Sequence, residues 1–402
     1  MAYMYLINVS LVFIYFFILY ISLIFLFRKR YSSDSKPFIS FIVPAFNAGV
    51  HVRKSIESIY KSYPRECLEV IAIDDKSTDN TLKIFKELKE KYGFKLLMNK
   101  KNIGKVASVN KASDYAKGEI IIFLDADIEI DKIVLSEIIA RLKKPNVVMT
   151  ASMYSPDNDK LLSRFQGVEF GMSHAFSNAL SPLSSIKSLY GGCMAIKREV
   201  FLELGKFNCA VVTEDTDLAF RVKEAGYKAE ICRNAVMNDV PRTFPHLWKQ
   251  KIRWNAGYHM ELLRHFGTFL KHPISLSLNI IGYSLLVFGI IASIKNYPLF
   301  YQFYQVFLIQ ISQNSFFNAL LIADEESKKV LTKLIFSIVV LPLIFVPFVL
   351  ANDRKARKNL FRLLIVYPYA MIYTPLITIP NLYGAFKGIY KFVTFNDKQR
   401  GW

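Results

Sequence analysis

Cysteine is scarce in this chain of 402 residues, and its four cysteines lack the paired spacing of a metal-binding motif. The chain shows no internal repeat and no low-complexity linker, and it is long enough for two domains. We predict a reducing environment and free thiols that mostly pack in the interior, at Cys67, Cys193, Cys209 and Cys232.

Acidic residues are also few: 33 Asp and Glu stand against 52 Lys and Arg, so the net charge is +19. Nucleic-acid binding is one explanation, but no recognition module is present and the cations are spread along the chain. A cytosolic face held against anionic lipids, handling an anionic nucleotide substrate, explains the excess better. The sequence therefore favours membrane lipids over nucleic acid as a partner.

Long apolar segments indicate a multi-pass protein of the cell membrane. Tyr5–Phe27 carries no charge, is long enough to cross a bilayer, and is followed rather than preceded by basic residues, so we expect a retained signal anchor. The positive-inside rule then places the amino terminus outside and the next domain in the cytosol. About five membrane helices are expected in all, the others at Pro273–Ser293, Leu299–Ala323, Lys333–Leu350 and Leu363–Gly384.

Alternating strand and helix patterns between Lys36 and Ser152 predict an α/β domain with a mostly parallel sheet. Strands are expected at Phe38–Val43, Leu68–Ile73, Phe94–Met98, Ile120–Leu124 and Asn146–Ala151. Helices are expected from Asp79 to a cap at Gly93, from Lys105 to Gly118, and from Asp131, with Ile133, Val134, Ile138 and Leu142 on its packed face.

Asp125-Ala126-Asp127 follows the most apolar of these strands. If the extended geometry persists, the two carboxylates share one face at the carboxyl end of the strand, where ligands bind in open α/β sheets. Two carboxylates there are costly unless a cation joins them, and a divalent metal that bridges a substrate diphosphate fits this need.

Other strand ends should open onto the same crevice. Asp74-Asp75 closes the second strand and suits the donor groups of a base and ribose, although a loop with a helix cap is the alternative. Lys105 could present a cation to phosphate at the start of a helix. We expect Pro44, Phe46 and Asn47, at the end of the first strand, to contribute to binding of the donor in this crevice.

Two further clusters lie nearer the carboxyl terminus. Thr213-Glu214-Asp215 supplies carboxylates, and Asp215 is the candidate base; the alternative is an N-cap with its first-turn acids. In Gln250-Lys251-Ile252-Arg253-Trp254, three side chains one turn apart could bind a diphosphate and pack on a sugar. An Arg–Trp pair that anchors the helix to lipid is the alternative reading.

These four clusters in this order, flanked by membrane segments, resemble the membrane-bound family 2 glycosyltransferases, which include cellulose, hyaluronan and poly-N-acetylglucosamine synthases. The resemblance covers about Lys36 to Phe266. It implies a GT-A fold, a nucleoside-diphosphate sugar donor, and an inverting displacement that depends on Mg²⁺ or Mn²⁺.

By position, the resemblance implies that Asp75 with Asp74 holds the base and ribose, that Asp127 beside Asp125 holds the metal, and that Asp215 acts as base with Glu214 beside it. It assigns the diphosphate and acceptor end to Gln250, Arg253, Trp254, Gly192 and Cys193, and an interfacial helix to the region of Gln166 and Glu169. Lys76 and Lys251 depart from the usual glycine and arginine, and Phe395 from a common tryptophan.

We therefore expect an enzyme that transfers a sugar from a nucleoside-diphosphate donor, with UDP as the expected nucleotide, to a growing polysaccharide at the membrane. Transfer of one sugar to a lipid or polyprenyl phosphate is the first alternative, and a non-catalytic membrane scaffold is the second. The expected parts are a membrane anchor (1–35), a nucleotide-sugar-binding half (36–152), an acceptor and catalytic half (153–271), and a C-terminal membrane region with a short tail (272–402).

Overall fold

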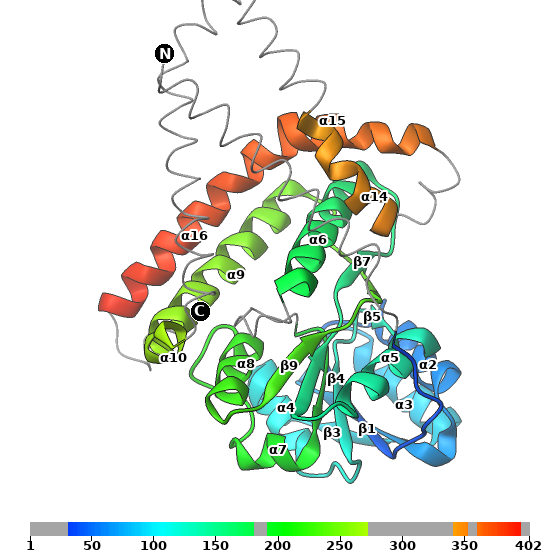
Figure 1. The fold of residues 1–402 in the computed structure, drawn as a ribbon. Coiled ribbons are helices and arrows are strands. Elements are labelled where there is room, and N and C mark those ends of the chain that lie inside the picture. Colours follow the sequence, from blue (N-terminus) through cyan, green and yellow to red (C-terminus); the bar gives the residue numbers. More distant parts are fainter. Residues whose placement is uncertain (1–30, 181–190, 272–340, 353–359, 395–402) are drawn as a thin grey trace, which may run out of the picture.

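The computed structural model of the chain describes residues 31–180, 191–271, 341–352 and 360–394. The predicted anchor and the predicted spans at 273–293 and 299–323 lie outside the described residues, as do Phe395 and the first part of the span at 333–350. The described part consists of an α/β domain with a set of helices above it (Figure 1).

A seven-stranded sheet in the order β3-β2-β1-β4-β8-β6-β9 forms the centre of the domain. The first four strands are mutually parallel, whereas β8 runs antiparallel to both of its neighbours. This confirms the predicted mostly parallel sheet. The strands are β1 (Ile39–Ala45), β2 (Leu68–Asp74), β3 (Lys95–Met98), β4 (Ile120–Leu124), β6 (Val147–Ala151), β8 (Cys193–Lys197) and β9 (Lys228–Ile231).

Apolar side chains alternate along the central strands and build one core on each face of the sheet. One face packs against α2 (Val52–Ser62), α3 (Thr81–Tyr92) and α5 (Lys132–Leu142). The other packs against α4 (Lys105–Ser113), α7 (Arg198–Glu203) and α8 (Glu214–Glu224). The sheet is thus covered on both sides, as parallel sheets require.

Several helix boundaries follow the expected chemistry. Gly93 ends α3 with a left-handed φ of 76°, and the Asp131 side chain caps α5 by accepting from the backbone amides of Ile133 and Val134. Two expectations were wrong. Ile133 is 57% exposed, so it lies off the packed face. The helix from Lys105 ends at Ser113 rather than Gly118, because the amides of residues 117 and 118 donate to the Ser40 hydroxyl instead of to helical carbonyls.

A second sheet of three short strands, in the order β5-β10-β7, lies beside the end of β4. It consists of β5 (Ile128–Glu129), β7 (Tyr154–Pro156) and β10 (Val236–Asn238). Strand β10 pairs antiparallel with β5, which brings a segment more than 100 residues away next to the turn after β4. Strands from beyond residue 152 also join the main sheet, while the predicted domain division at that residue stays a prediction.

Helix α6 (Leu161–Leu180) contains Gln166 and Glu169, and helix α9 (Phe244–Arg264) contains the Gln-x-x-Arg-Trp segment. They lie beside the C-terminal helical turns, with α16 (Thr374–Thr394) along the length of α9 (Figure 1). The remaining elements are η1 (Arg65–Cys67), α10 (Phe266–Leu270), η4 (Leu341–Phe345), α14 (Val346–Asn352), η5 (Leu360–Ile365), α15 (Val366–Pro368) and η6 (Tyr369–Tyr373).

Among the described residues, one helical stretch is long and apolar enough to cross a membrane: Leu360–Thr394, in which a window of 18 residues has a mean hydropathy of 1.5. It contains the predicted span Leu363–Gly384. The side of α16 that faces away from α9 exposes large apolar residues, such as Ile379, Phe386 and Val393. These features suit contact with lipid by length and composition.

Glycine allows α16 to approach α9 closely. A Cβ atom on Gly384 would lie 2.7 Å from the carbonyl oxygen of Ile252, and one on Gly388 would overlap the backbone of Ala256. Asn255 also donates to Asn381 across the interface, at 2.8 Å. Close backbone packing at small residues is a common way of joining helices in a membrane setting.

We predict that Gly388→Ala weakens this contact, because the new methyl group meets helix backbone that cannot rotate away. Overpacking of this kind costs about 1–3 kcal/mol, so the thermal unfolding midpoint of the purified chain should fall by several degrees. Gly267→Ala is the control, since nothing lies within 4 Å of a Cβ there. Equal midpoints for the two variants would contradict the predicted close contact.

Candidate active site

The Asp125-Ala126-Asp127 segment forms a turn rather than a continuation of β4. The strand ends at Leu124, and the amide of Ile128 donates to the Asp125 carbonyl at 3.1 Å. The extended geometry on which the shared face depended therefore does not persist, and that expectation was wrong. Asp125 is partly buried at the strand end, whereas Asp127 is exposed at the tip of the turn.

Lys105 joins two of the predicted acidic clusters. Its ammonium lies 2.7 Å from an Asp125 carboxylate oxygen and 3.6 Å from one of Glu214. Although desolvation works against its charge, these two carboxylates raise the pKa of Lys105, so the side chain stays cationic. The segments at 105, 125 and 214, far apart in sequence, thus meet at the carboxyl edge of the sheet.

Asp215 lines the same hollow as Lys105, Asp125, Glu214 and Pro44. Its carboxylate accepts from the amide of Thr216 at 2.7 Å. Desolvation, and then the charge of Glu214, raise the pKa of Asp215 to about 7. A carboxyl group with a pKa near neutrality suits a general base. The capping alternative is met in part, because Thr213 is the N-cap residue of α8 and the acids lie in its first turn, but the Thr213 side chain makes no cap hydrogen bond.

Asp127 has a similar pKa from different surroundings. Desolvation of the carboxylate, and then the neighbouring charge of Asp125, raise the pKa of Asp127 to about 7. Among the described residues its carboxylate takes part in no ion pair, in contrast to Asp125. An exposed carboxylate in negative surroundings is a suitable oxygen ligand for Mg²⁺ or Mn²⁺.

The structure gives Asp74 and Asp75 internal partners. Asp75 is buried and accepts from the side chain of Asn99 and from the amides of Ile103 and Gly104, all at 2.8–2.9 Å. It therefore fixes the loop that leads into α4 and to Lys105. Asp74 accepts from the Ser77 amide with one oxygen, while its other oxygen is buried without a hydrogen-bond partner.

The loop after β1 is braced against the loop after β2. Asn47 donates its amide to Ser77 at 3.0 Å, and its side-chain oxygen accepts from the Thr78 amide at 2.8 Å. Asn47 and Lys76 both have left-handed φ values, 52° and 65°. Phe46 projects outward and is half exposed, which leaves its ring open to a ligand. Strained turns with an exposed aromatic residue are typical of binding loops.

Two glycines leave room for side chains at the site. A Cβ on Gly191 would lie 2.8 Å from an Asp215 oxygen, and one on Gly192 would lie 2.5 Å from the Tyr154 hydroxyl oxygen. The Gly192 carbonyl accepts from the Asp125 amide at 2.8 Å, so this segment also holds the turn after β4. Cys193 is completely buried in β8 and is not among the residues that line the hollow around Asp215.

The Gln-x-x-Arg-Trp segment lies on one continuous helix, α9, as predicted. Arg253 is exposed and forms no ion pair with the parts of the chain that the structure describes. The side-chain oxygen of Gln250 is buried without a hydrogen-bond partner among the described residues. A Cβ on Gly257, one turn beyond Arg253, would meet the side chain of Thr213, so α9 packs closely against the segment that carries Asp215.

Two residues of this site were not predicted from the sequence. Asp239 follows β10, and the pairing of Asn238 with Ile128 places it opposite Asp127, whose pKa its charge helps to raise. Tyr154 is buried beneath the site and its hydroxyl oxygen accepts from the Gly192 amide. No sequence signal marks these positions, because strand pairing over a long separation brings them in.

Comparison with known proteins agrees with this geometry. The family model for glycosyl transferase family 2 matches residues 40–205. This match covers less than half of the chain, which is similar to the family over that segment. The chain is 28% identical over 244 residues to a poly-beta-1,6-N-acetyl-D-glucosamine synthase of Staphylococcus epidermidis, an alignment that covers 58% of this chain and 57% of that protein. It thus spans little more than half the length of that relative.

Two further similarities widen the comparison. A probable glycosyltransferase of Bacillus subtilis (strain 168) is 27% identical over 61% of this chain and 60% of its own length. A mannosyltransferase from Pyrobaculum calidifontis, solved with GDP-Man and Mn²⁺, superposes with a TM-score of 0.56 at 19% identity, over 95% of this chain and 98% of that one. At this identity the likeness concerns the fold, and it confirms the expected GT-A type of α/β domain.

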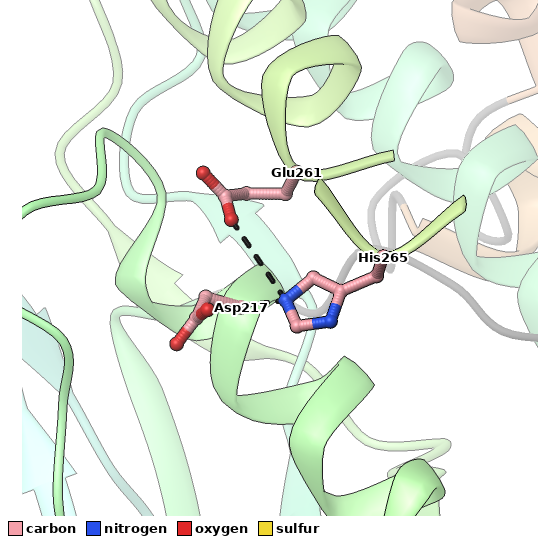
Figure 2. A group of neighbouring side chains, drawn as sticks. All are labelled: Asp217, Glu261 and His265. Carbon is pink, nitrogen blue, oxygen red and sulfur yellow. Dashed lines mark hydrogen bonds and ion pairs between the residues drawn. The ribbon is translucent and has the colours of Figure 1, made fainter. Parts of the chain in front are cut away.

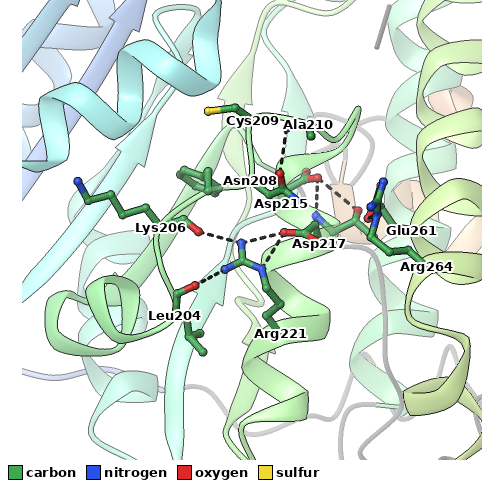
Figure 3. Close-up of polar contacts among 12 residues, drawn as sticks. Leu204, Lys206, Asn208, Cys209, Ala210, Asp215, Asp217, Arg221, Glu261 and Arg264 are labelled. Atoms are coloured by element: carbon green, nitrogen blue, oxygen red, sulfur yellow. Dashed lines mark hydrogen bonds and ion pairs between the residues drawn. The ribbon is translucent and has the colours of Figure 1, made fainter. Parts of the chain in front are cut away.

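A separate buried cluster joins α8 to α9. Asp217, Glu261 and His265 bring potential ligand atoms within 4.8 Å of one another (Figure 2). Arg221 pairs with Asp217 at 2.8 Å, and Arg264 with Glu261 at 3.1 Å (Figure 3). These carboxylates therefore already have cationic partners.

His265 supplies a third cation to this cluster. One ring nitrogen lies 3.2 Å from Asp217 and the other 2.8 Å from Glu224. Despite its desolvation, the hydrogen bonds to these carboxylates raise the pKa of His265. An imidazolium that donates from both nitrogens fills the position that a metal ion would need. We interpret the cluster as an ionic joint between the two helices.

We predict that His265→Gln destabilises the chain more at pH 6 than at pH 8.5. Because the folded-state pKa of His265 is raised, its contribution is fully present below its unfolded value near 6.5 and is lost as pH rises through the folded value. Burying Asp217 without this partner should cost about 1–3 kcal/mol, measured as a fall in the thermal midpoint.

Glu261 also titrates in this range, because burial raises its pKa to about 7, but Glu261 is present in both the wild type and His265→Gln. The control is His246→Gln, at an exposed position on α9. A difference between wild type and His265→Gln that is constant from pH 6 to 8.5 would show that the charge of the ring is not what stabilises the joint.

Proposed function

We propose that the chain is an inverting glycosyltransferase that moves a sugar from a nucleoside-diphosphate donor to a growing polysaccharide at the membrane. The observation that carries this proposal is the meeting of Lys105, Asp125, Glu214 and Asp215 in one hollow at the carboxyl edge of the sheet. Carboxylates crowded at a sheet edge beside a cation, inside a family 2 glycosyl transferase domain, suit a nucleotide-sugar site.

In this proposal the acceptor hydroxyl attacks the anomeric carbon of the donor sugar, and Asp215 takes the hydroxyl proton. The bond from that carbon to the diphosphate oxygen breaks as the new glycosidic bond forms, which inverts the configuration. The leaving nucleoside diphosphate gains negative charge, and Lys105 and Arg253 neutralise it by donating hydrogen bonds. Lys105 is held by Asp125 and Glu214 until the diphosphate arrives.

A divalent cation fits the residues at the turn after β4. Asp127 offers an exposed carboxylate that forms no ion pair with the described residues. The charges of Asp125 and Asp239 both raise the pKa of Asp127, so these two carboxylates lie near it. Mg²⁺ and Mn²⁺ prefer such oxygen ligands, and a bound ion would supply charge neutralisation at the diphosphate. The Mn²⁺ in the mannosyltransferase from Pyrobaculum calidifontis supports this assignment.

Asn47, Phe46 and the loop fixed by Asp75 provide the surface for the nucleotide. Phe46 is exposed and can pack against a base, and Asp74 retains one buried oxygen without a partner. Asp75 contributes by shaping the loop at residues 99–104. The Gly191-Gly192 segment borders Asp215, and we assign the acceptor side to this segment and to Trp254.

UDP-N-acetylglucosamine is the proposed donor, because the staphylococcal relatives are named as synthases of poly-beta-1,6-N-acetyl-D-glucosamine. The exposed apolar side of α16 and the stretch Leu360–Thr394 support a position at the membrane. The basic residues that follow the predicted anchor are the reason for proposing that the catalytic domain lies on the cytosolic side.

Product analysis tests this function. Purified full-length chain incubated with Mn²⁺ and either UDP-N-acetylglucosamine or GDP-mannose should consume the UDP-sugar faster and yield products of many sugars, and EDTA should stop the reaction. Products that carry one sugar on an extractable lipid would establish the non-processive alternative. Absence of donor turnover with every UDP- and GDP-sugar tested would favour a non-catalytic role.

We predict that Asp215→Asn lowers turnover by about 10²–10⁴-fold, the usual contribution of a general base. In the wild type, kcat/KM at saturating metal should fall tenfold per pH unit below about 7, because a protonated Asp215 cannot accept the proton. The variant should lose this acidic limb while its affinity for the donor, measured by calorimetry, changes little. An unchanged turnover would remove Asp215 from the role of base.

A further inference from the structure

The second residue of the Gln-x-x-Arg-Trp segment has an unusual environment. Lys251 is 4% exposed, and its ammonium lies 2.7 Å from a carboxylate oxygen of Glu169 on α6. The same ammonium lies over two aromatic rings, 4.9 Å from the centre of the Trp254 ring and 5.6 Å from that of Phe170. A buried cation therefore holds the face of the tryptophan one turn further along α9.

Glu169 connects this cation to the C-terminal helical segment. Its second carboxylate oxygen accepts from the hydroxyl of Tyr373, at 2.6 Å. Tyr373 is 2% exposed and belongs to η6, more than 200 residues away in sequence. One carboxylate thus links α6, α9 and η6, and both of its oxygens are used.

Stability alone does not account for this arrangement. Desolvating an ion pair is costly, and well-packed apolar side chains of the same volume often replace such pairs without loss. The surroundings already supply them, because Phe165, Leu247 and Tyr369 form an apolar cluster between the same elements. What a hydrogen-bonded charge provides in addition is direction: the ammonium attracts the indole face and limits the angles it can adopt.

We propose that Lys251, Glu169 and Tyr373 are positioning residues that set the orientation of the Trp254 ring toward the acceptor, so that the C-terminal helical segment governs acceptor binding. The proposal rests on the proposed function in one respect, the assignment of Trp254 to the acceptor. The chain of contacts itself is independent of that assignment.

A single-tryptophan reporter makes the arrangement measurable. The sequence contains three tryptophans, Trp248, Trp254 and Trp402, so Trp248→Phe with Trp402→Phe leaves Trp254 alone in the full-length chain. In this background we compare Lys251→Met, Lys251→Arg and Tyr373→Phe. The matched control is Tyr383→Phe, which removes a hydroxyl from a side chain that is 56% exposed on α16.

Lys251→Met and Tyr373→Phe are expected to shift the emission maximum of Trp254 and to increase its quenching by acrylamide. With UDP-N-acetylglucosamine and a β-1,6-linked N-acetylglucosamine tetramer as acceptor, they should raise the acceptor KM by about three- to tenfold, the scale of one lost cation–π contact. The donor KM and kcat should change less than twofold. Lys251→Arg, which keeps the cation, should retain the wild-type emission and acceptor KM, as should Tyr383→Phe.

Unchanged emission and unchanged acceptor KM in Lys251→Met would overturn the proposal. Equal effects of Lys251→Met on kcat, donor KM and acceptor KM would also overturn it, because a general structural loss would then explain them. Trp254→Ala separates the premise from the inference. An unaltered acceptor KM there removes Trp254 from the acceptor site, whereas a raised value there beside an unaffected Lys251→Met refutes the positioning contacts alone.

Discussion

The ionic contact of Lys105 with Asp125 and Glu214 is the interaction on which the rest of the site depends. Parallel strands end at one edge, and the residues that follow them bring carboxylates close together. Desolvation and the neighbouring carboxylates raise the pKa of Asp127 and Asp215 even though the charge of Lys105 acts to lower it, so these acids would be still harder to keep charged without the lysine. The lysine allows the acidic groups to stay near each other before any ligand binds.

Buried hydrogen bonds of Asp75 to the preceding loop set the position of Lys105. Asp75 is buried and uses both carboxylate oxygens on the loop that precedes α4, so the acidic pair at the end of β2 acts on the site through the backbone. The Gly191-Gly192 segment does the same on the other side, since it holds the Asp125 amide and leaves space for Asp215. Such supporting contacts keep charged groups in place at a low entropic cost.

Helix α9 connects this charged edge to the helices above it. At one end, the cluster of Asp217, Glu261 and His265 joins it to α8, which carries Asp215. Further along, Lys251 joins it to α6 and to η6, and the glycines of α16 pack against its backbone. The helix with the Gln-x-x-Arg-Trp segment is thus the common support for the proposed base, the proposed acceptor residues and the C-terminal apolar stretch.

Local chemistry in the sequence predicted a large part of this architecture. Apolar runs of five to seven residues became the buried strands, Gly93 and Asp131 ended and began helices as expected, and the order of the acidic clusters anticipated the match to the family 2 model. These features depend on neighbours within one or two turns, where periodicity and capping carry the information. The approach of Lys105 to Asp125 agrees with strand ends that share an edge in a parallel sheet, whereas Asp215, at the start of α8, was linked to them only by the resemblance.

Tertiary structure alone decided the contacts made over long separations. The sequence did not reveal that the chain turns at Asp125, that β10 brings Asp239 opposite Asp127, or that Tyr373 reaches Glu169. Nor did it show that Ile133 would face solvent. Each outcome depends on strand register or helix packing between segments that lie far apart, and local patterns carry no information about which distant partner a surface will meet.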